Sequence, residues 1–218
     1  MRKIIVLMGA PGAGKGTLAR LLRERMRLPQ ISPGDMFREI RNVGKPLSRE
    51  MRAVMDAGLL ISDSLVNRMV RERTRRPDCR AGYILDGFPR TAMQAELLEE
   101  LAREQGNEIV TVFVDVPVEI LEKRITGRRL CPVCGEIYNI NYRPSRSGKF
   151  CDRHPEAELF HRTDDYPQKV KVRLGEYEEK TRPLIDRFGV LYLVNGAREP
   201  EAIYADITKN FRSQFIVP

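Results

Sequence analysis

The chain has 218 residues, of which 42% are hydrophobic, so it can bury the core of one large domain or of one domain with small inserts, and disorder is excluded. No apolar run approaches the ~20 residues of a membrane helix, and residues 4–8 are too short for a signal peptide, so we expect a cytoplasmic protein without membrane contact. The net charge of +8 indicates an anionic partner, either a nucleic acid or a phosphorylated small molecule.

Strands and helices are predicted to alternate along the chain. Apolar, β-rich runs predict strands at residues 3–8, 30–31, 82–85, 110–116 and 190–194. Amphipathic spacing predicts helices at residues 17–26 and 91–104, after Pro117 in a first turn, and around Ile203, Ile207 and Phe211. This alternation predicts an α/β protein whose five-stranded parallel sheet is covered by helices on both faces.

Two stretches interrupt the alternation. Residues 32–62 look mostly helical and carry no long strand, and residues 127–165 are rich in Cys, Pro, Gly and Arg and follow neither period. Each begins where a strand or helix has just ended, so we expect both to be inserts on the ligand-binding edge of the sheet. The core domain is then formed by residues 1–31, 63–126 and 166–218.

The stretch GAPGAGKGT, residues 9–17, follows the first predicted strand and leads into the first predicted helix. Its glycines allow backbone N–H groups to approach phosphate oxygens closely, the helix presents its positive end, and Lys15 adds a charge. The usual phosphate loop has Ser or Thr directly after the lysine, whereas here Gly16 intervenes before Thr17. An ordinary glycine turn is the alternative, but the order of strand, loop, lysine and helix favours a phosphate loop.

The motif GxPGxGKGT resembles the loop of nucleoside monophosphate kinases, in which Gly16 and Thr17 stand in their expected places. The resemblance continues through SPGDMFR (32–38), AGLLISD (57–63), LDGFPR (85–90), Arg124, Arg128, RTDD (162–165) and EEKTRPL (178–184), and it covers nearly the whole chain. The best match is the adenylate kinase family with a long lid. The resemblance implies a three-layer P-loop NTPase fold with a helical AMP-binding insert at 32–62 and a zinc-containing lid at 127–165.

The resemblance also implies a reaction, the reversible transfer of the γ-phosphoryl group of Mg-ATP to AMP, which gives two ADP. The AMP phosphate brings its own nucleophilic oxygen, so alignment, positive charge and dryness matter more than a protein base. The residues expected to act on the transferring group are Lys15, Arg90, Arg124, Arg128, Arg162 and Arg173. The residues expected to bind ATP are Gly12, Ala13, Gly14, Lys15, Gly16, Thr17, Arg124, Arg128, Tyr138 and Arg198.

The residues expected to bind AMP are Pro33, Arg38, Ile61, Gly87, Arg90, Gln94, Arg162 and Arg173. Arginine can hold a phosphate bidentately, as lysine cannot. Gln94 is expected to recognise the adenine edge, but Thr91 and Gln94 also match a capping box that would occupy this side chain. The family usually has Thr where this chain has Pro33, which removes a hydroxyl and a backbone donor near the base.

Several of these residues have simpler alternative roles. Asp86, at the end of a predicted strand, is expected to hold Mg²⁺ through water, or it could cap a helix or loop. Asp164 and Asp165 lie near the expected lid hinge and could merely cap the helix that Pro167 begins. Glu119 or Glu122 could pair with Arg124 and Arg128 on a solvated helix face.

Paired cysteines predict a structural zinc site in the lid. Cys131 and Cys134 form one C-x₂-C pair, and Cys151 and His154 form a second pair later in the same insert. Asp152 is the nearest competing ligand, and Cys79, far away in sequence, is expected to be a lone thiol. Such a set of four ligands leaves no open position for catalysis.

Three functions are therefore considered. The first is an adenylate kinase that acts as a monomer on ATP, AMP and ADP without nucleic acid. The second is a kinase for another nucleoside monophosphate. The third is a zinc-stabilised, nucleic-acid-binding ATPase, although the arginines do not form a stripe with stacking aromatics.

Overall fold

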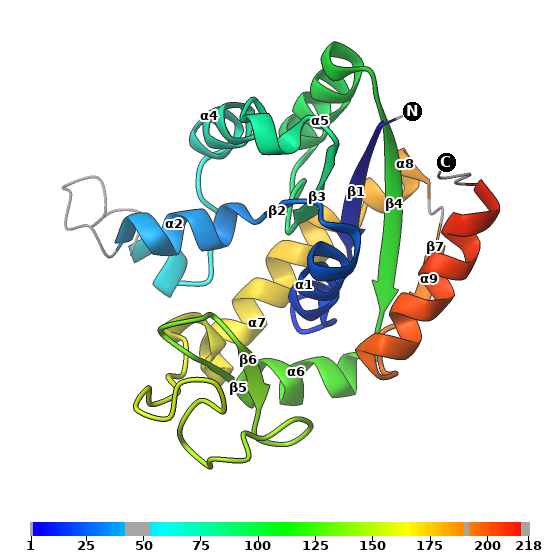
Figure 1. The fold of residues 1–218 in the computed structure, drawn as a ribbon. Helices are drawn as coiled ribbons and strands as arrows, with labels where there is room; N and C mark the ends of the chain where they lie inside the picture. The colour runs from blue at the N-terminus through cyan, green and yellow to red at the C-terminus, as the bar shows by residue number, and fades with distance from the viewer. Residues whose placement is uncertain (1, 42–52, 190–191, 215–218) are drawn as a thin grey trace.

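The computed structural model describes residues 2–41, 53–189 and 192–214 (Figure 1). The strands of the described residues are β1 (Arg2–Met8), β2 (Gln30–Ile31), β3 (Gly82–Asp86), β4 (Asn107–Asp115), β5 (Arg128–Leu130), β6 (Ile137–Asn139) and β7 (Tyr192–Asn195). The helices are α1 (Lys15–Met26), α2 (Pro33–Arg41), α4 (Asp63–Thr74), α5 (Ala92–Gln105), α6 (Val118–Thr126), α7 (Pro167–Glu176), α8 (Leu184–Phe188) and α9 (Pro200–Gln214). Short 3₁₀ turns at Pro77–Cys79 and Thr163–Asp165 and a π-helical turn at Tyr177–Thr181 complete the assignment.

The main sheet confirms the predicted architecture. Its five strands are all parallel and lie in the order β2-β3-β1-β4-β7. β4 starts three residues earlier than predicted, because the polar Asn107 and Glu108 pair with Arg2 and Lys3 and extend the ladder beyond its apolar part. Two residues of the last predicted strand, 190 and 191, lie outside the described residues.

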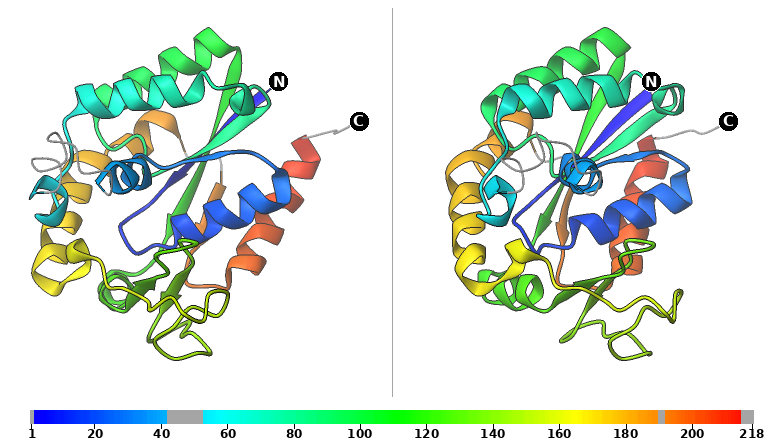
Figure 2. Two further views of the ribbon diagram at one scale, coloured as in Figure 1. Left: turned by 60° about the vertical axis from the view of Figure 1, so that its left-hand side comes forward. Right: turned by 90° about the vertical axis from the view of Figure 1, so that its left-hand side faces the viewer.

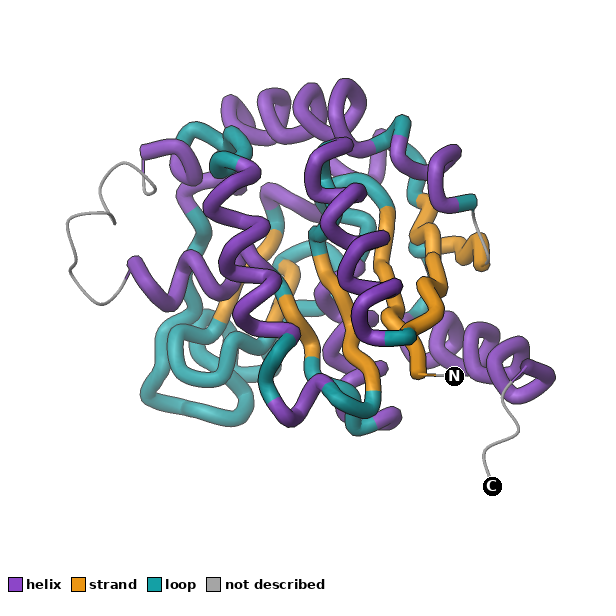
Figure 3. Tube along the Cα trace, turned by 90° about the horizontal axis from the view of Figure 1, so that it is seen from above, coloured by secondary structure: helices purple, strands orange, loops and turns teal. Residues whose placement is uncertain are grey.

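Side chains of β1 alternate between the two faces of the sheet, as the pleat requires. Ile4, Val6 and Met8 belong to a core cluster with side chains of α2, α4, α5 and α8. Ile5 and Leu7 belong to a second cluster with α1, α6 and α9. The sheet therefore lies between two helical layers (Figures 2 and 3), which confirms the predicted three-layer α/β fold.

Helix ends differ slightly from prediction. α1 begins at Lys15 and not at residue 17, because Gly14 takes the left-handed N-cap conformation. Pro117 is the N-cap of α6, so its predicted place in the first turn is wrong by one position. On α9, Ile203 and Ile207 are buried as predicted, whereas the Phe211 side chain lies outside the described residues.

The two stretches that interrupt the alternation of strands and helices add nothing to the main sheet in the described residues. Between 32 and 62, α2 and a helical turn at residues 53–56 are described, and residues 42–52 lie outside the description. In residues 127–165, β5 and β6 form an antiparallel hairpin followed by loops. This segment lies at the end of the molecule toward which the β4 arrow points (Figure 1). Within the described residues, none of the helices is both long and apolar enough to cross a bilayer.

Candidate active site

The loop between β1 and α1 has the geometry of a phosphate site. Gly12 has φ +83°, and a Cβ at this position would lie 2.7 Å from Cγ1 of Ile125 and 2.9 Å from the Leu121 carbonyl oxygen, so only glycine fits. The first turn of α1 has no side-chain cap. Its N–H groups and the positive end of its dipole are therefore available to an anion.

Lys15 supplies the charge of the loop. Its Nζ donates hydrogen bonds to the carbonyl oxygens of Gly9 and Ala10, both at 2.8 Å. Burial, together with the charges of nearby arginines, lowers the pKa of Lys15 to about 7, although the Asp86 carboxylate opposes the shift. Phosphate oxygens in this loop would reverse the balance, since negative charge favours the protonated amine.

Arg38 and Arg90, the predicted acceptor arginines, come from α2 and from the loop after β3. Arg90 Nε donates to the Gly87 carbonyl oxygen at 2.9 Å, and a Cβ on Gly87 would lie 2.7 Å from Arg90 Nη2. Arg38 pairs with Asp35, one helical turn earlier. Burial lowers the pKa of both guanidinium groups, and the positive charge of Arg162 acts in the same direction. Half-buried like charges of this kind are suited to an anionic ligand.

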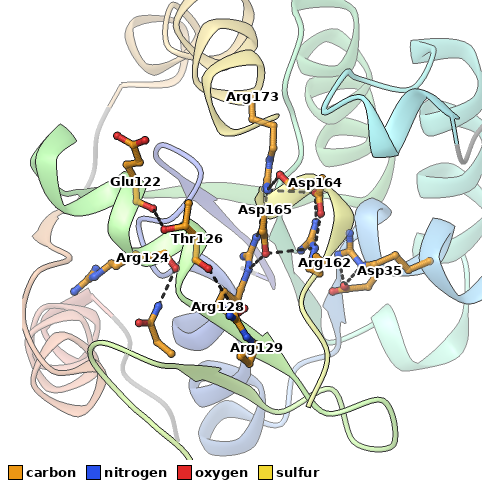
Figure 4. A network of polar contacts seen from close by, with 12 residues as sticks. Asp35, Glu122, Arg124, Thr126, Arg128, Arg129, Arg162, Asp164, Asp165 and Arg173 are labelled. Atoms are coloured by element: carbon orange, nitrogen blue, oxygen red, sulfur yellow. Dashed lines mark hydrogen bonds and ion pairs between the residues drawn. The ribbon is translucent and has the colours of Figure 1, made fainter. Parts of the chain in front are cut away.

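Three arginines and two aspartates form a cluster where the lid joins α7 (Figure 4). Arg128 donates to both carboxylate oxygens of Asp165, at 2.7 and 2.5 Å. Arg162 pairs with Asp164, and Arg173 Nη1 donates to Asp165 at 2.5 Å and to the Asp164 carbonyl oxygen at 3.0 Å. Burial opposes ionisation of both aspartates, but the arginines outweigh it and hold each pKa below its usual value. Three positive and two negative charges leave the cluster with one net positive charge, and its three arginines line the same cleft as the phosphate loop.

This cluster rules out two of the alternative roles. The N-cap of α7 is Tyr166, without a side-chain cap, so Asp164 and Asp165 do not cap this helix because the arginines occupy their carboxylates. Pro167 begins α7 as predicted. Among the described residues, the partners of Arg124 and Arg128 are the Gly196 carbonyl and Asp165, so pairing with the helix glutamates Glu119 and Glu122 is also wrong.

Three further predicted ATP-binding residues come from α6, from β6 and from the loop between β7 and α9. Arg124 Nη1 donates to the Gly196 carbonyl oxygen at 2.6 Å, and its guanidinium lies 5.5 Å from the centroid of the Tyr142 ring. Arg198 pairs with Asp206 of α9. The Tyr138 hydroxyl accepts from the Asp152 amide at 3.0 Å, inside the lid, so only the rest of this side chain can face a nucleotide.

One cleft of about 780 Å³ brings these residues together. Its size lies in the upper part of the range for small-molecule sites, roughly 300–1,000 Å³. Pro33, which begins α2, and Ile61, packed against the core, line it as well. The predicted nucleotide residues that line it are Gly12, Ala13, Gly14, Lys15, Gly16, Thr17, Pro33, Arg38, Ile61, Gly87, Arg90, Gln94, Arg124, Arg128, Tyr138, Arg162, Arg173 and Arg198.

Asp86 ends β3 beside the phosphate loop. Its Oδ2 accepts from Gln30 Nε2 at 3.2 Å and lies 3.3 Å from where a Cβ on Gly16 would be. Burial raises the pKa of this carboxyl, and the Lys15 charge opposes the shift. The next helix, α5, is capped by Thr91, so the structure gives Asp86 no capping role there. A half-buried carboxylate beside the phosphate loop fits a site for a hydrated Mg²⁺ ion.

Gln94 has three hydrogen bonds that bear on its two predicted roles. Its backbone N–H donates to Thr91 Oγ1 at 3.3 Å, so this half of the capping box is confirmed. Its side-chain Oε1 accepts from the Arg90 N–H at 2.8 Å, one residue before the amide that a capping box would use. Its Nε2 donates to Asp63 Oδ1 at 2.7 Å. Recognition of adenine by Gln94 stays a prediction.

The lid brings the four predicted metal ligands together. All ligand atoms of Cys131, Cys134, Cys151 and His154 lie within 4.8 Å of one another. Three of the separations are 3.7 to 3.9 Å, including 3.9 Å between the Sγ atoms of Cys134 and Cys151. A tetrahedral zinc ion with bonds of ~2.3 Å to sulfur places its ligands ~3.8 Å apart, so the set fits zinc.

Asp152 and Cys79, the other two residues considered, take no part in this cluster. Asp152 Oδ1 accepts from Ser145 Oγ at 2.7 Å and from two backbone amides, so its predicted role as a competing ligand is wrong. Cys79 is a separate, buried thiol, as predicted. Burial raises the pKa of Cys79 to about 11, which keeps it protonated.

Known proteins with similar sequences belong to one family of enzymes. The family model described as adenylate kinase matches residues 7–191. The chain belongs to the adenylate kinase family. The adenylate kinases of Anaeromyxobacter dehalogenans (strain 2CP-1) and Thermodesulfovibrio yellowstonii are 45% and 44% identical to it over 210 and 207 residues. These alignments cover 94% and 93% of this chain, and 97% and 96% of the relatives. Membership of the adenylate kinase family confirms the predicted resemblance and favours neither alternative function.

Three residues that bond to cleft-lining side chains of this adenylate kinase family member were not predicted. Asp35 pairs with Arg38, and their spacing of three residues on a helix was an available signal. Asp63 fixes the Gln94 amide. Glu136, in the lid, accepts from Arg20 of α1 at 2.9 Å, and nothing local in the sequence indicates this pair because 116 positions separate the two residues.

Proposed function

We propose that this protein catalyses the reversible transfer of the γ-phosphoryl group of Mg-ATP to AMP, giving two ADP. The proposal depends on one observation, the convergence on a single cleft of the phosphate loop and of arginines from the core and from both inserts. The acceptor phosphate supplies its own nucleophilic oxygen. The reaction therefore needs two nucleotides aligned in a dry, positively charged site, and it needs no protein base.

We assign one group of residues in this cleft to the donor, ATP, and another group to the acceptor, AMP. Loop residues 12–17 hold the phosphates of ATP, with the positive end of α1 behind them, and Arg124, Tyr138 and Arg198 contact the rest of ATP. Arg38 and Arg90 hold the AMP phosphate bidentately, while Pro33, Ile61, Gly87 and Gln94 surround its nucleoside.

The buried cluster at the lid hinge acts between these two sites. Arg128, Arg162 and Arg173 already have their positions set by Asp164 and Asp165. Positioned cations of this kind stabilise the charge that spreads over the transferring group without a reorganisation at the moment of reaction. Lys15 adds to this field from the loop.

Residues 127–165 form the lid, residues 32–62 form the AMP-binding insert, and the remaining residues form the core. Closure of the lid over the phosphate loop excludes water, which would otherwise compete with AMP for the phosphoryl group. The contact of Arg20 with Glu136 supports this assignment, since it joins the lid to the helix behind the loop. All residues of the site come from one chain, so we expect the monomer to be active.

The proposed function includes two metal ions, a structural Zn²⁺ and the Mg²⁺ that is bound with ATP. Cys131, Cys134, Cys151 and His154 hold a structural Zn²⁺, which when bound replaces a hydrophobic core in a lid that buries few apolar side chains of its own. Asp86 holds, through water, the Mg²⁺ that arrives with ATP and that neutralises phosphate charge when bound.

A coupled assay of ADP formation tests the proposed function. Purified protein with Mg-ATP is given AMP, CMP, UMP or GMP in turn, each with and without an oligonucleotide. We expect AMP to be the preferred acceptor and the oligonucleotide to have no effect. Faster turnover of another monophosphate would overturn the acceptor assignment, and ATP hydrolysis stimulated by the oligonucleotide would overturn the proposed function.

A further inference from the structure

The side-chain amide of Gln94 is held in one orientation by two partners whose roles are unambiguous. The Arg90 backbone N–H can only donate, and it lies 2.8 Å from Oε1. The Asp63 carboxylate accepts, and its Oδ1 lies 2.7 Å from Nε2. A flip of the amide would set two donors against each other at Arg90 and two acceptors against each other at Asp63.

These two contacts use only part of the hydrogen-bonding capacity of the amide. One N–H of Nε2 and one lone pair of Oε1 remain. Gln94 is 2% exposed and lines the cleft, so these groups are shielded from bulk water and are available to a base bound against this wall of the cleft. A buried site built to hydrogen-bond one pattern rejects the opposite pattern strongly, because its own polar groups are then left unpaired.

Adenine and the 6-oxo purines present opposite patterns to such an amide. Adenine offers a donor at N6 and an acceptor at N1, which match Oε1 and the N–H of Nε2. Guanine and hypoxanthine offer an acceptor at O6 and a donor at N1, which would match only the flipped amide. We propose that Asp63 is a positioning residue for substrate choice: it fixes the Gln94 amide in the orientation that accepts a 6-amino purine and rejects a 6-oxo purine.

This inference depends on the proposed function, since it takes the base of the acceptor nucleotide to lie against Gln94. The identity of residue 33 supports the inference about Asp63. Proline at the start of α2 offers neither a hydroxyl nor an N–H to the base. More of the selection between purines then falls to Gln94 and to the residue that orients it.

The test compares AMP with inosine monophosphate, which differs from AMP only in the hydrogen-bonding pattern at positions 6 and 1. We would measure kcat/KM for both acceptors, and KM for ATP, in the wild type, Asp63→Ala, Asp63→Asn and Gln94→Ala. In Asp63→Ala we expect the preference for AMP to fall about tenfold, while KM for ATP stays unchanged. The preference is not abolished, because the Arg90 N–H still favours the original orientation.

Asparagine at position 63 keeps an oxygen that can accept from Nε2, so Asp63→Asn should retain the wild-type preference to within about twofold. Gln94→Ala should lose at least as much of the preference for AMP as Asp63→Ala does. Asp63 also lies in the first turn of α4, where a carboxylate stabilises the helix. Glu119→Ala removes an exposed carboxylate from the first turn of α6 and should leave the preference unchanged.

An unchanged preference in a folded Asp63→Ala variant that still uses AMP would overturn the inference and leave the proposed function intact. An equal loss of preference in Asp63→Asn would also overturn it, because charge and not hydrogen-bond geometry would then be responsible. Failure of the wild type to phosphorylate AMP would remove both the inference and the proposed function.

Discussion

Among single residues, Arg90 owes its proposed role to how little of its guanidinium the protein uses. In the described part of the chain, Arg90 uses only its Nε, which donates to the Gly87 carbonyl oxygen. Its two terminal nitrogens are left for a bidentate contact with phosphate, a geometry that a lysine ammonium cannot reproduce. Geometry and charge therefore both matter at this position.

We predict that Arg90→Ala lowers kcat by at least about 10²-fold, the usual loss when one stabilising donor is removed from a reacting centre. Arg90→Lys should recover little of this, since a point charge does not align the phosphate. Steady-state kinetics measures the effect, and Arg187→Ala, which breaks a surface pair with Glu99, serves as the control. Turnover like that of the wild type in Arg90→Ala would remove the acceptor assignment.

Lys15 should make nucleotide binding depend on pH. Its pKa of about 7 in the free protein means that most of it is neutral at pH 8, and bound phosphates favour the charged form. Binding above pH 7 should therefore take up a proton, and this uptake by Lys15 should disappear below about pH 6, where the amine is already protonated. Calorimetry in two buffers of different ionisation enthalpy measures the uptake at pH 8. Lys15→Arg, which stays charged, should show none, and equal uptake in this variant would contradict the assignment.

At the scale of whole elements, the proposed lid contacts α1 through an ion pair, Arg20 with Glu136, that the proposed reaction does not require. Arg20 donates to Glu136 at 2.9 Å and to the Gly135 carbonyl oxygen at 3.1 Å, and Glu136 also pairs with Arg143 within the lid. Because Arg20 belongs to α1, its contacts with Gly135 and Glu136 would be made only when the proposed lid is docked over the phosphate loop. They therefore favour the closed position.

We predict that Arg20→Gln raises KM for ATP by about three- to tenfold, since the docked lid loses a largely buried charged hydrogen bond. KM for AMP should be unaffected. Arg25→Gln makes the same change at an exposed position of the same helix and should have no effect. Equal rises in KM for ATP and AMP would show that the pair does not act through the lid.

The metal cluster allows a matched comparison of cysteines within this chain. Cys134→Ser should lower the zinc content from about one ion per chain to none and should speed proteolysis within residues 127–165, because the proposed metal would replace a hydrophobic core in this segment. Cys79→Ser removes a cysteine outside the cluster and should keep the metal. Elemental analysis of both proteins measures the outcome. Loss of metal in both variants, or in neither, would contradict the assignment of ligands.

Across the whole molecule, local signals predicted the core and the outline of the site. The apolar run of β1, the glycines before Lys15 and the cysteine pairs are each encoded within a few residues, and the structure has them in the predicted arrangement. Individual side-chain pairs between distant segments were not predicted. Thr163 and Asp56, which join the lid hinge to the AMP-binding insert, are 107 positions apart. Asp63 was missed for the same reason, since only the fold brings it to Gln94.

The central claim is that one cleft binds two nucleotides with their phosphates end to end. Calorimetric titration with diadenosine pentaphosphate, which joins two adenosines through five phosphates, tests this most directly. We expect one molecule to bind per chain and to block the binding of both ATP and AMP. Absence of binding, or a complex that still admits AMP, would contradict this claim.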